Sequence, residues 1–413
     1  MLTTGVILIL TCLVACAVWG AVWVNAARND RMLPAVAEGL ERAGGAPLPK
    51  LSVVLPMHNE AHDAPGCIET LRAQDYAELE IVLSLDRCTD ETPAIARDAA
   101  AVDPRLRVVE TEPIDGWWGK CVPMEEGAEA AGGAWLVFID ADTRLDPTLL
   151  RAAMGLALDR GWDMIGVLPR LTTGAAFERV VQPVATMQMM YMFQPQKINR
   201  EADRRPFGLG PFMMLSRRAY DAAGLMASVK DDIQEDVAVA RAVHAAGYRV
   251  GLASGDGLFD CRMFTRFHEF YHGWKRIFTR MSGNRVGRLR KYALRLLGMG
   301  VLLPAAQLAA VTMGIVSLAT GATMLGTALI LAGGAAFGVE LGAIGRIYRR
   351  GGAGPLSRAA FPLGFAAVAW LLNDAASHLK AGRPVRWAGR DYVLTPRKGR
   401  RNAGPRTGGA GAR

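Results

Sequence analysis

Three long apolar stretches in this 413-residue chain restrict it to folds that meet a membrane. Met1 to Ala27 contains no charged side chain, and a helix of about 20 apolar residues already spans a bilayer. Leu296–Leu318 and Met324–Ile344 are also long enough, and an uncharged Ala-Thr-Gly-Ala turn joins them. We therefore expect an N-terminal transmembrane helix at residues 1–27 and a transmembrane hairpin at residues 293–345.

The positive charges beside these stretches predict their orientation. Arg28 and Arg31 follow the first stretch, and basic residues favour the cytoplasmic side. The middle of the chain is then cytoplasmic in a multi-pass protein of the cell inner (plasma) membrane. The last apolar stretch, Ala359–Leu372, has about 14 residues and suits a re-entrant or interfacial segment, with a short tilted transmembrane helix as the alternative. It falls within residues 346–394, and we expect a disordered basic tail at residues 395–413.

The composition agrees with membrane contact. Hydrophobic residues make up 51% of the chain, the mean hydropathy is +0.15, and the net charge is +9. Much of the positive excess lies in Arg262–Lys291 and after Lys380, beside apolar stretches, where basic residues typically meet anionic lipid headgroups. No nucleic-acid motif accompanies these charges, so we expect no nucleic-acid partner. The six cysteines contain no C-x-x-C pair, which argues against a disulfide framework or a zinc site.

After a linker at residues 28–50, short apolar runs alternate with helical patterns. The expected strands are Leu51–Leu55, Ile81–Leu85, Leu106–Glu110 and Trp135–Ile139, and the clearest helices are Thr92–Ala101, Lys120–Ala131 and Asp236–Ala246. Strands that alternate with helices form parallel sheets with right-handed crossovers. We therefore expect an α/β domain with a mostly parallel sheet at residues 51–292.

Asp140 and Asp142 directly follow the apolar run Trp135–Ile139. Ligands of open α/β sheets bind at the carboxyl ends of the strands. Two carboxylates there can hold Mg²⁺ or Mn²⁺ against a diphosphate, because Mg²⁺ takes one or two protein carboxylates and completes its shell with phosphates and water. The stretch Asp140-Ala-Asp142-Thr143 also resembles the nucleophile motif of haloacid-dehalogenase-type phosphatases. That motif ends the first strand of its domain, whereas about 90 residues of α/β pattern precede it here.

Five stretches in a fixed order resemble family 2 glycosyltransferases with a GT-A fold. They are Val54–Glu60, Leu85–Thr92, Trp118–Lys120, Asp140–Asp142 and Gln234–Asp236. The resemblance covers roughly residues 51–280 and implies a GT-A nucleotide-diphospho-sugar transferase domain. The apolar stretches and the tail Trp387–Tyr392 look like the lipid-directed branch, which includes ceramide glucosyltransferase-like, hopanoid-associated and carotenoid glycosyltransferases.

The resemblance assigns donor-binding roles to four positions. Pro56 and Glu60 match the loop that holds base and ribose, where Glu60 can accept hydrogen bonds. Asp86 matches the carboxylate that binds the uracil ring, although Leu85 replaces an Asp found in many members. Lys120 matches the lysine near the diphosphate, whose charge a cation offsets. The alternative for these residues is a solvated turn or a helix start.

The acidic positions receive the chemical roles. Asp142 is expected to hold the metal, and Asp140 to reach the ribose or a metal-bound water. Asp236, with Glu235 beside it, matches the acid that takes the proton from the acceptor hydroxyl in an inverting transfer. Helix capping is the alternative for these two acids. Repulsion within the acidic cluster at residues 231–236 is expected to raise at least one pKa, and the sequence leaves open which.

The acceptor side matches less closely. Gly210 lies in a stretch that resembles the acceptor-lining segment, with a turn before a buried strand as the alternative. Family members with a Gln/Arg-x-x-Arg-Trp motif differ from Tyr271–Arg276, in which Trp and Arg occur in reversed order. We expect Trp274 to stack on a base or sugar and Lys275, Arg276 or Arg280 to touch the diphosphate. A basic amphipathic helix on the membrane is the alternative.

These observations predict a membrane-anchored inverting glycosyltransferase. It would move a sugar from a nucleotide-diphosphate sugar, with a UDP-sugar as the expected donor, to a membrane lipid, using Mg²⁺ or Mn²⁺. A polysaccharide synthase of the same family and an inactive nucleotide-sugar-binding membrane scaffold are the alternatives.

Overall fold

A twisted α/β sheet forms the centre of the structure, a computed structural model that describes residues 2–43, 47–199, 206–232, 234–255, 257–351, 353–387 and 390–397. Within those residues seven strands run in the order β3-β2-β1-β4-β8-β6-β9. They are β1 (Leu51–Met57), β2 (Leu79–Asp86), β3 (Leu106–Thr111), β4 (Trp135–Ile139), β6 (Met164–Leu168), β8 (Phe212–Ser216) and β9 (Val250–Ser254). Of these strands only β8 is antiparallel to its neighbours. The predicted mostly parallel α/β fold is confirmed.

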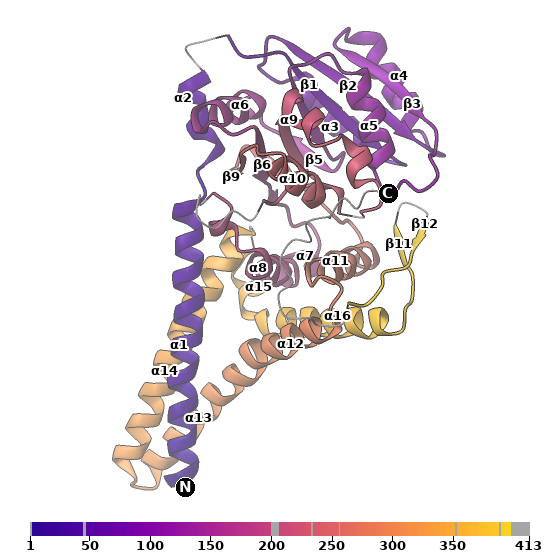
Figure 1. Cartoon of the computed structure of the whole chain (residues 1–413). Coiled ribbons are helices and arrows are strands. Elements are labelled where there is room, and N and C mark those ends of the chain that lie inside the picture. Colours follow the sequence, from indigo (N-terminus) through magenta and orange to yellow (C-terminus); the bar gives the residue numbers. More distant parts are fainter. Residues whose placement is uncertain are drawn as a thin grey trace, which may run out of the picture.

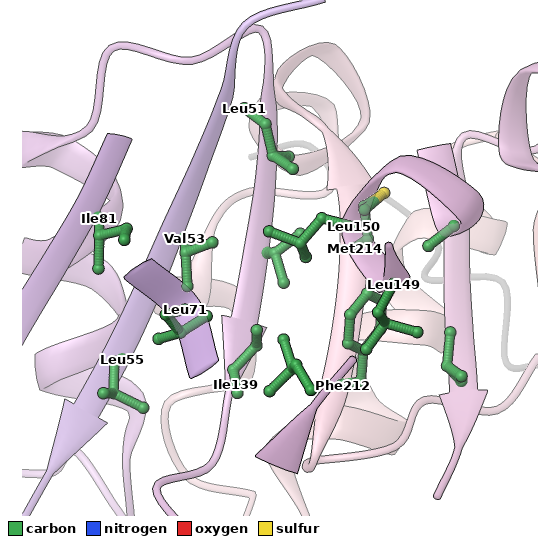
Figure 2. Packing of buried hydrophobic residues seen from close by; sticks show 14 of the residues in the cluster. Leu51, Val53, Leu55, Leu71, Ile81, Ile139, Leu149, Leu150, Phe212 and Met214 are labelled. Carbon is green, nitrogen blue, oxygen red and sulfur yellow. The ribbon is translucent and has the colours of Figure 1, made fainter. Parts of the chain in front are cut away.

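Both faces of the central strands β1 and β4 are buried, which explains their continuous apolar sequences. On one face Val53 and Leu55 pack with Leu71 of a covering helix (Figure 2). On the opposite face Val54 packs with Met124. The first face is covered by α3 (Ala64–Arg72), α4 (Thr92–Val102) and α6 (Leu149–Arg160), and the second by α5 (Cys121–Ala130), α9 (Arg217–Ala222) and α10 (Glu235–Ala245). Successive residues of β1 point to opposite faces of the sheet and therefore pack against both helical layers.

A small second sheet fixes the chain just after β4. It contains β5 (Thr143–Leu145), β10 (Phe259–Cys261) and β7 (Arg170–Leu171), in the order β5-β10-β7. The backbone N–H of Arg262 donates to the carbonyl oxygen of Asp142 at 2.9 Å. Asp142 thus lies between two sheets rather than on a free loop.

The region predicted as a linker, residues 28–50, is largely helical where it is described. It contains the end of α1 (Leu2–Met32), the 3-10 turn η1 (Val36–Glu38) and α2 (Gly39–Ala43). A Cβ on Gly39 would lie 2.0 Å from the carbonyl oxygen of Ala152 in α6. This region therefore packs tightly on the α/β domain, because glycine allows the two backbones to approach.

Three helical segments extend from the α/β domain (Figure 1). Among the described residues, the segments long and apolar enough to cross a membrane are Leu2–Asn29, Val286–Ala319 and Thr323–Arg349. They correspond to α1, to α12 (Val286–Leu297) continued through η5 (Gly298–Leu302) into α13 (Leu303–Ala319), and to α14 (Thr323–Arg350). The helix of the second segment begins before the predicted hairpin boundary at residue 293. In Figure 1, α1, α13 and α14 run side by side.

The last apolar stretch forms one unbroken helix, α16 (Phe361–Lys380), which lies crosswise to those three helices (Figure 1). It continues past the predicted end at Leu372 because Asp374 is paired with α11 (Phe267–Met281), where Lys275 lies 2.7 Å away. Beside it lie α7 (Ala176–Val180), α8 (Gln182–Phe193) and α15 (Pro355–Ala359), and a hairpin follows with β11 (Val385–Trp387) and β12 (Arg390–Tyr392). Of the predicted disordered tail, residues 398–413 lie outside the described residues. The membrane position of α16 stays a prediction.

Candidate active site

The predicted site residues converge because of the strand order. The carboxyl ends of β1, β2 and β4 lie at one edge of the sheet. Since β8 is antiparallel, its amino end lies at the same edge, with Phe212 opposite Ile139. Gly210, two residues before β8, therefore comes next to Asp140, one residue after β4. The strand topology alone brings together segments about 70 residues apart in the sequence.

Asp140 forms an ion pair with Lys120, which immediately precedes α5. The Lys120 Nζ atom lies 2.5 Å from Asp140 Oδ1. Burial opposes the charged form of Lys120, but Asp140, Glu235 and Glu60 outweigh this effect and raise the pKa of its amine. The lysine thus stays cationic in the middle of an acidic cluster.

Asp236 is fixed by backbone donors at the start of α10. Its Oδ2 accepts a hydrogen bond from the N–H of Gly210 at 2.9 Å, and its Oδ1 accepts one from the N–H of Val237 at 2.7 Å. A Cβ on Gly210 would lie 3.5 Å from Asp140 Oδ2 and 3.7 Å from Asp236 Oδ2. The two carboxylates therefore border the same small space above Gly210.

Gly208 explains how Asp236 comes so close to that segment. A Cβ at Gly208 would lie 2.0 Å from the backbone carbonyl oxygen of Asp236. Only glycine permits this approach without a shift of either backbone. Gly208 lies two positions before Gly210, and no role was predicted for it.

Asp142 lies behind Asp140, toward the small sheet. Its Oδ1 is 3.6 Å from the Sγ of Cys261, a buried thiol in β10. Burial raises the pKa of the Asp142 carboxyl and the neighbouring Asp140 raises it further, while Lys120 acts in the opposite direction. Cys261 was not predicted at this site, and its spacing from Asp142 in the sequence offered no signal.

The donor-loop residues lie at the same edge. Pro56 is buried near the end of β1. The backbone N–H of Glu60 donates to Thr92 Oγ1 at 2.8 Å, and its carboxyl group interacts with Lys120 and Asp140. The Asp86 carboxylate is held by Arg87, whose Nε and Nη2 lie 2.8 and 2.6 Å away.

The basic residues of helix α11 have partners on two sides, the acidic site and α16. Arg276 interacts with Glu235, Asp140 and Asp236. By contrast, Lys275 pairs with Asp374 of α16 at 2.7 Å. Arg276 is thus the cation of α11 that acts electrostatically on Glu235, Asp140 and Asp236.

The expectation that Trp274 stacks on a base or sugar is wrong for this conformation. Its side chain is 0% exposed and packs between Phe270 and Phe278. Trp274 precedes Arg276 by two positions, and a rotation of about 200° on the helix turns it to the opposite face. It belongs to the core that joins α11 to α16.

Tyr392 of the C-terminal hairpin is a site neighbour that sequence reasoning did not identify. Its hydroxyl oxygen accepts a hydrogen bond from the N–H of Gly119 at 3.2 Å. Its ring centroid lies 5.1 Å from that of Trp118. It also interacts with Arg87 and Arg276. The tail motif Trp387–Tyr392 could have drawn attention to this residue. It supported only a family resemblance, however, and did not indicate where Tyr392 lies in the fold.

The site as a whole carries more acidic than basic groups. Five carboxyl groups, those of Glu60, Asp140, Asp142, Glu235 and Asp236, face the cations of Lys120 and Arg276. Burial raises the pKa of the carboxyl groups of Glu60, Glu235 and Asp236, and Asp236 adds to the effect at Glu235. Such a cluster favours binding of additional positive charge, as a divalent cation provides.

Known proteins share parts of this chain. Residues 52–224 match the family described as Glycosyl transferase family 2. The uncharacterized glycosyltransferase YibD of Escherichia coli (strain K12) is 33% identical over 115 residues, which cover 28% of this chain and 32% of YibD. A GalNAc(5)-diNAcBac-PP-undecaprenol beta-1,3-glucosyltransferase of Campylobacter jejuni is 28% identical over 98 residues, or 24% of this chain and 31% of that protein. The chain thus spans about a third of the length of these curated relatives.

A solved structure shares the architecture. Mannosyltransferase PcManGT from Pyrobaculum calidifontis, in complex with GDP-Man and Mn²⁺, is similar with a TM-score of 0.50 and 19% identity, covering 90% of this chain and 99% of that chain. At this identity the similarity shows the fold alone. Together with the matched family and the strand order, it shows that this chain carries a family 2 glycosyltransferase domain with a GT-A fold.

Proposed function

We propose that this protein is a membrane-anchored inverting glycosyltransferase that moves a sugar from a nucleoside-diphosphate sugar to a membrane lipid. One observation carries the proposal: Asp140 and Asp236 border the same space above Gly210, at 3.5 and 3.7 Å from its Cβ position. This arrangement sets a donor-side carboxylate beside a potential base. A UDP-sugar is the donor we expect, because Asp86 matches the uracil-binding position of the family.

Asp236 is the proposed general base. It would accept the proton of the acceptor hydroxyl as that oxygen attacks the sugar carbon and the bond to the diphosphate breaks. The N–H groups of Gly210 and Val237 orient its two oxygens. Lys120 and Arg276 would offset the negative charge of the leaving diphosphate.

Asp142 and Asp140 fit a divalent cation only as part of a site shared with the donor. The described residues contain no group of three or more His, Cys, Asp or Glu side chains that could hold a metal. Mg²⁺ or Mn²⁺ would need only one or two protein carboxylates if the diphosphate supplies further oxygens. When bound, the metal supplies Lewis-acid stabilisation of the leaving diphosphate. We therefore expect weak metal binding by the protein alone and much tighter binding with UDP.

The lipid acceptor is supported by the position of the domain. The segments able to span a membrane extend from it, and α11, which carries Arg276, packs on α16 (Figure 1). The Campylobacter jejuni relative is named for an undecaprenol-linked acceptor. The proposed location is the cell inner (plasma) membrane, with the transferase domain in the cytoplasm. The tail residues 395–397 and the helix α16 would lie on that side.

The test uses the full chain reconstituted in vesicles of native lipid extract. Vesicles are incubated with labelled nucleotide sugars and Mn²⁺, and the lipids are then extracted. Label in the organic phase supports the proposal, and Asp236→Asn should lower the rate by about 10²- to 10⁴-fold. Asp142→Asn should abolish the metal dependence. Asp98→Asn, an exposed carboxylate on α4, is the matched control and should keep full activity.

Other outcomes would contradict the proposal. Label found only in insoluble polymer would identify a polysaccharide synthase. Binding of UDP without any transfer or donor hydrolysis would identify an inactive scaffold. Full activity in both the Asp142 and Asp236 variants would show that the site residues are wrongly assigned.

A further inference from the structure

A cavity of about 860 Å³ lies between the α/β domain and the helices that extend from it. Its walls come from the end of α1, from α8, from Arg295 in α12, from Met299 in η5 and from the end of α14. None of the proposed catalytic or donor-binding residues lines it. It is therefore a separate site from the acidic cluster.

The cavity lies at the level where the membrane-spanning segments end. Asn25 and Asn29 line it, and Asn29 is the last residue of the first spanning segment. Arg346 and Ile347 also line it, just before the third segment ends at Arg349. If these segments cross a bilayer, the cavity opens at the depth of the lipid headgroups.

The walls combine cationic and apolar groups. Arg31, Arg295 and Arg346 contribute positive charge, while Met187 and Met190 contribute flexible apolar surface. Two further arginines of the lining lie in ion pairs, Arg160 with Glu38 at 3.1 Å and Arg170 with Asp260 at 2.7 Å. The other three lie on the side of α1, α12 and α14.

Arg295 is the residue that most clearly points to a ligand. Its guanidinium lies over the ring of Tyr191, 3.4 Å from the centroid, and donates to Gln188 Oε1 at 2.7 Å. Among the described residues no carboxylate forms an ion pair with it, and its buried Nε atom has no hydrogen-bond partner. A partly buried guanidinium without a carboxylate partner is costly, and a phosphate group matches its planar set of donors.

We propose that this cavity binds the phosphate headgroup of an anionic phospholipid. The phosphate would lie against Arg295 and Arg346, and the acyl chains would extend along the apolar surfaces of α1 and α14. Basic pockets between helices on the cytoplasmic side of a membrane bind anionic headgroups in this way. The bound lipid would join α1, α8, α12 and α14 and so stabilise the contact between the membrane helices and the α/β domain. This role does not depend on the proposed transferase activity.

Lipid titration of the purified full chain in detergent tests the proposal. The ligands are phosphatidylglycerol, phosphatidylcholine and inorganic phosphate, and the readouts are retained lipid by native mass spectrometry and the melting temperature. Phosphatidylglycerol should be retained in preference to phosphatidylcholine and should raise the melting temperature. Arg295→Gln should weaken phosphatidylglycerol retention by about fivefold, as expected for loss of one basic contact.

Matched variants separate a binding defect from a folding defect. Arg290→Gln removes the same charge from an exposed position of α12 outside the cavity and should leave retention unchanged. Arg295→Lys keeps the charge and should retain most of the binding. Equal retention of the two lipids, or equal effects of the Arg290 and Arg295 variants, would overturn the proposal. A rise in melting temperature with inorganic phosphate alone, without lipid preference, would assign the cavity to a free anion and would also overturn it.

Discussion

The hydroxyl of Tyr392 accepts a hydrogen bond from the backbone N–H of Gly119 at 3.2 Å, across a separation of 273 residues. Gly119 lies between Trp118, which contacts the Tyr392 ring, and Lys120, which pairs with Asp140. The C-terminal hairpin therefore supports the loop that positions the lysine of the proposed donor site.

We expect Tyr392→Phe to weaken donor binding without unfolding the protein. The ring contact with Trp118 remains, and the hydrogen bond from the Gly119 N–H, worth about 0.5–1.5 kcal/mol, is lost. The KM for the nucleotide sugar should then rise by about twofold to tenfold, with a smaller change in kcat. Initial rates at varied donor concentration provide the measurement. Tyr248→Phe makes the same change at a site remote from Gly119, and an equal effect there would refute a specific role for Tyr392.

Gly210→Ala should impair activity more than stability. The added Cβ would meet Asp140 Oδ2 at 3.5 Å and Asp236 Oδ2 at 3.7 Å, which are ordinary contact distances. The methyl group would nevertheless occupy the space that the two carboxylates border. We expect kcat/KM to fall by at least about tenfold while the melting temperature changes little.

Two other glycine-to-alanine variants are controls for Gly210→Ala. Gly208→Ala places a Cβ 2.0 Å from the Asp236 carbonyl oxygen and should lower both activity and melting temperature. Gly287→Ala, on α12 with nothing within 4 Å of its Cβ position, should alter neither. A large stability loss in Gly210→Ala would contradict the interpretation.

Lys120→Met should destabilise the protein because it removes a cation from the buried acidic cluster. Loss of one partner of such a pair costs about 3–5 kcal/mol when burial is complete, so about 2–3 kcal/mol is expected for this partly exposed lysine. Adding Asp140→Asn should recover part of that loss, since the two residues are coupled. Thermal melts of the single and double variants provide a double-mutant cycle, which gives the coupling free energy between Lys120 and Asp140.

Lys50→Met is the control for the lysine variant. Lys50 lies 3.7 Å from Glu80 in an exposed pair, and such pairs contribute at most about 1 kcal/mol. If Lys50→Met and Lys120→Met lower the melting temperature equally, burial of the Lys120 pair is not the cause of its effect.

The metal-free protein should become less stable as pH rises from the ordinary carboxyl range. Burial raises the folded-state pKa of Asp142, Glu235 and Asp236 above the unfolded value. Between those two values the folded state binds more protons than the unfolded state, so the free energy of unfolding falls with increasing pH. UDP with Mn²⁺ should restore stability at the upper end of this window.

Melting temperatures between about pH 4 and pH 8, measured with EDTA and with Mn²⁺ plus UDP, test this expectation. Asp142→Asn removes one of the titrating groups and should flatten the pH dependence. A metal-free protein that gains stability steadily across the window would show that these carboxyl groups are not buried as described.

Four strands of the large sheet were predicted, and the clearest of them, β1 and β4, are buried on both faces. Such burial demands a continuous apolar run, and Trp135–Ile139 was predicted with the bounds that β4 has in the structure. Asp140 and Asp142 follow this run directly, so the parallel sheet pattern was enough to expect them at the carboxyl edge. The helices able to span a membrane could also be predicted, because length and lack of charge can be read directly from the sequence.

The tertiary structure decided which side chains reach the site. The sequence contained Trp274, Lys275 and Arg276 as neighbours, but the packing of α11 on α16 determined that Trp274 is buried and Arg276 interacts with the acids. The approach of Tyr392 to Gly119 and the cavity beside Arg295 likewise depend on segments that are remote in the chain. Local patterns determine where strands and spans form, because burial periodicity is local. Contacts between distant elements depend on how whole helices pack, and no single stretch of this sequence encodes that arrangement.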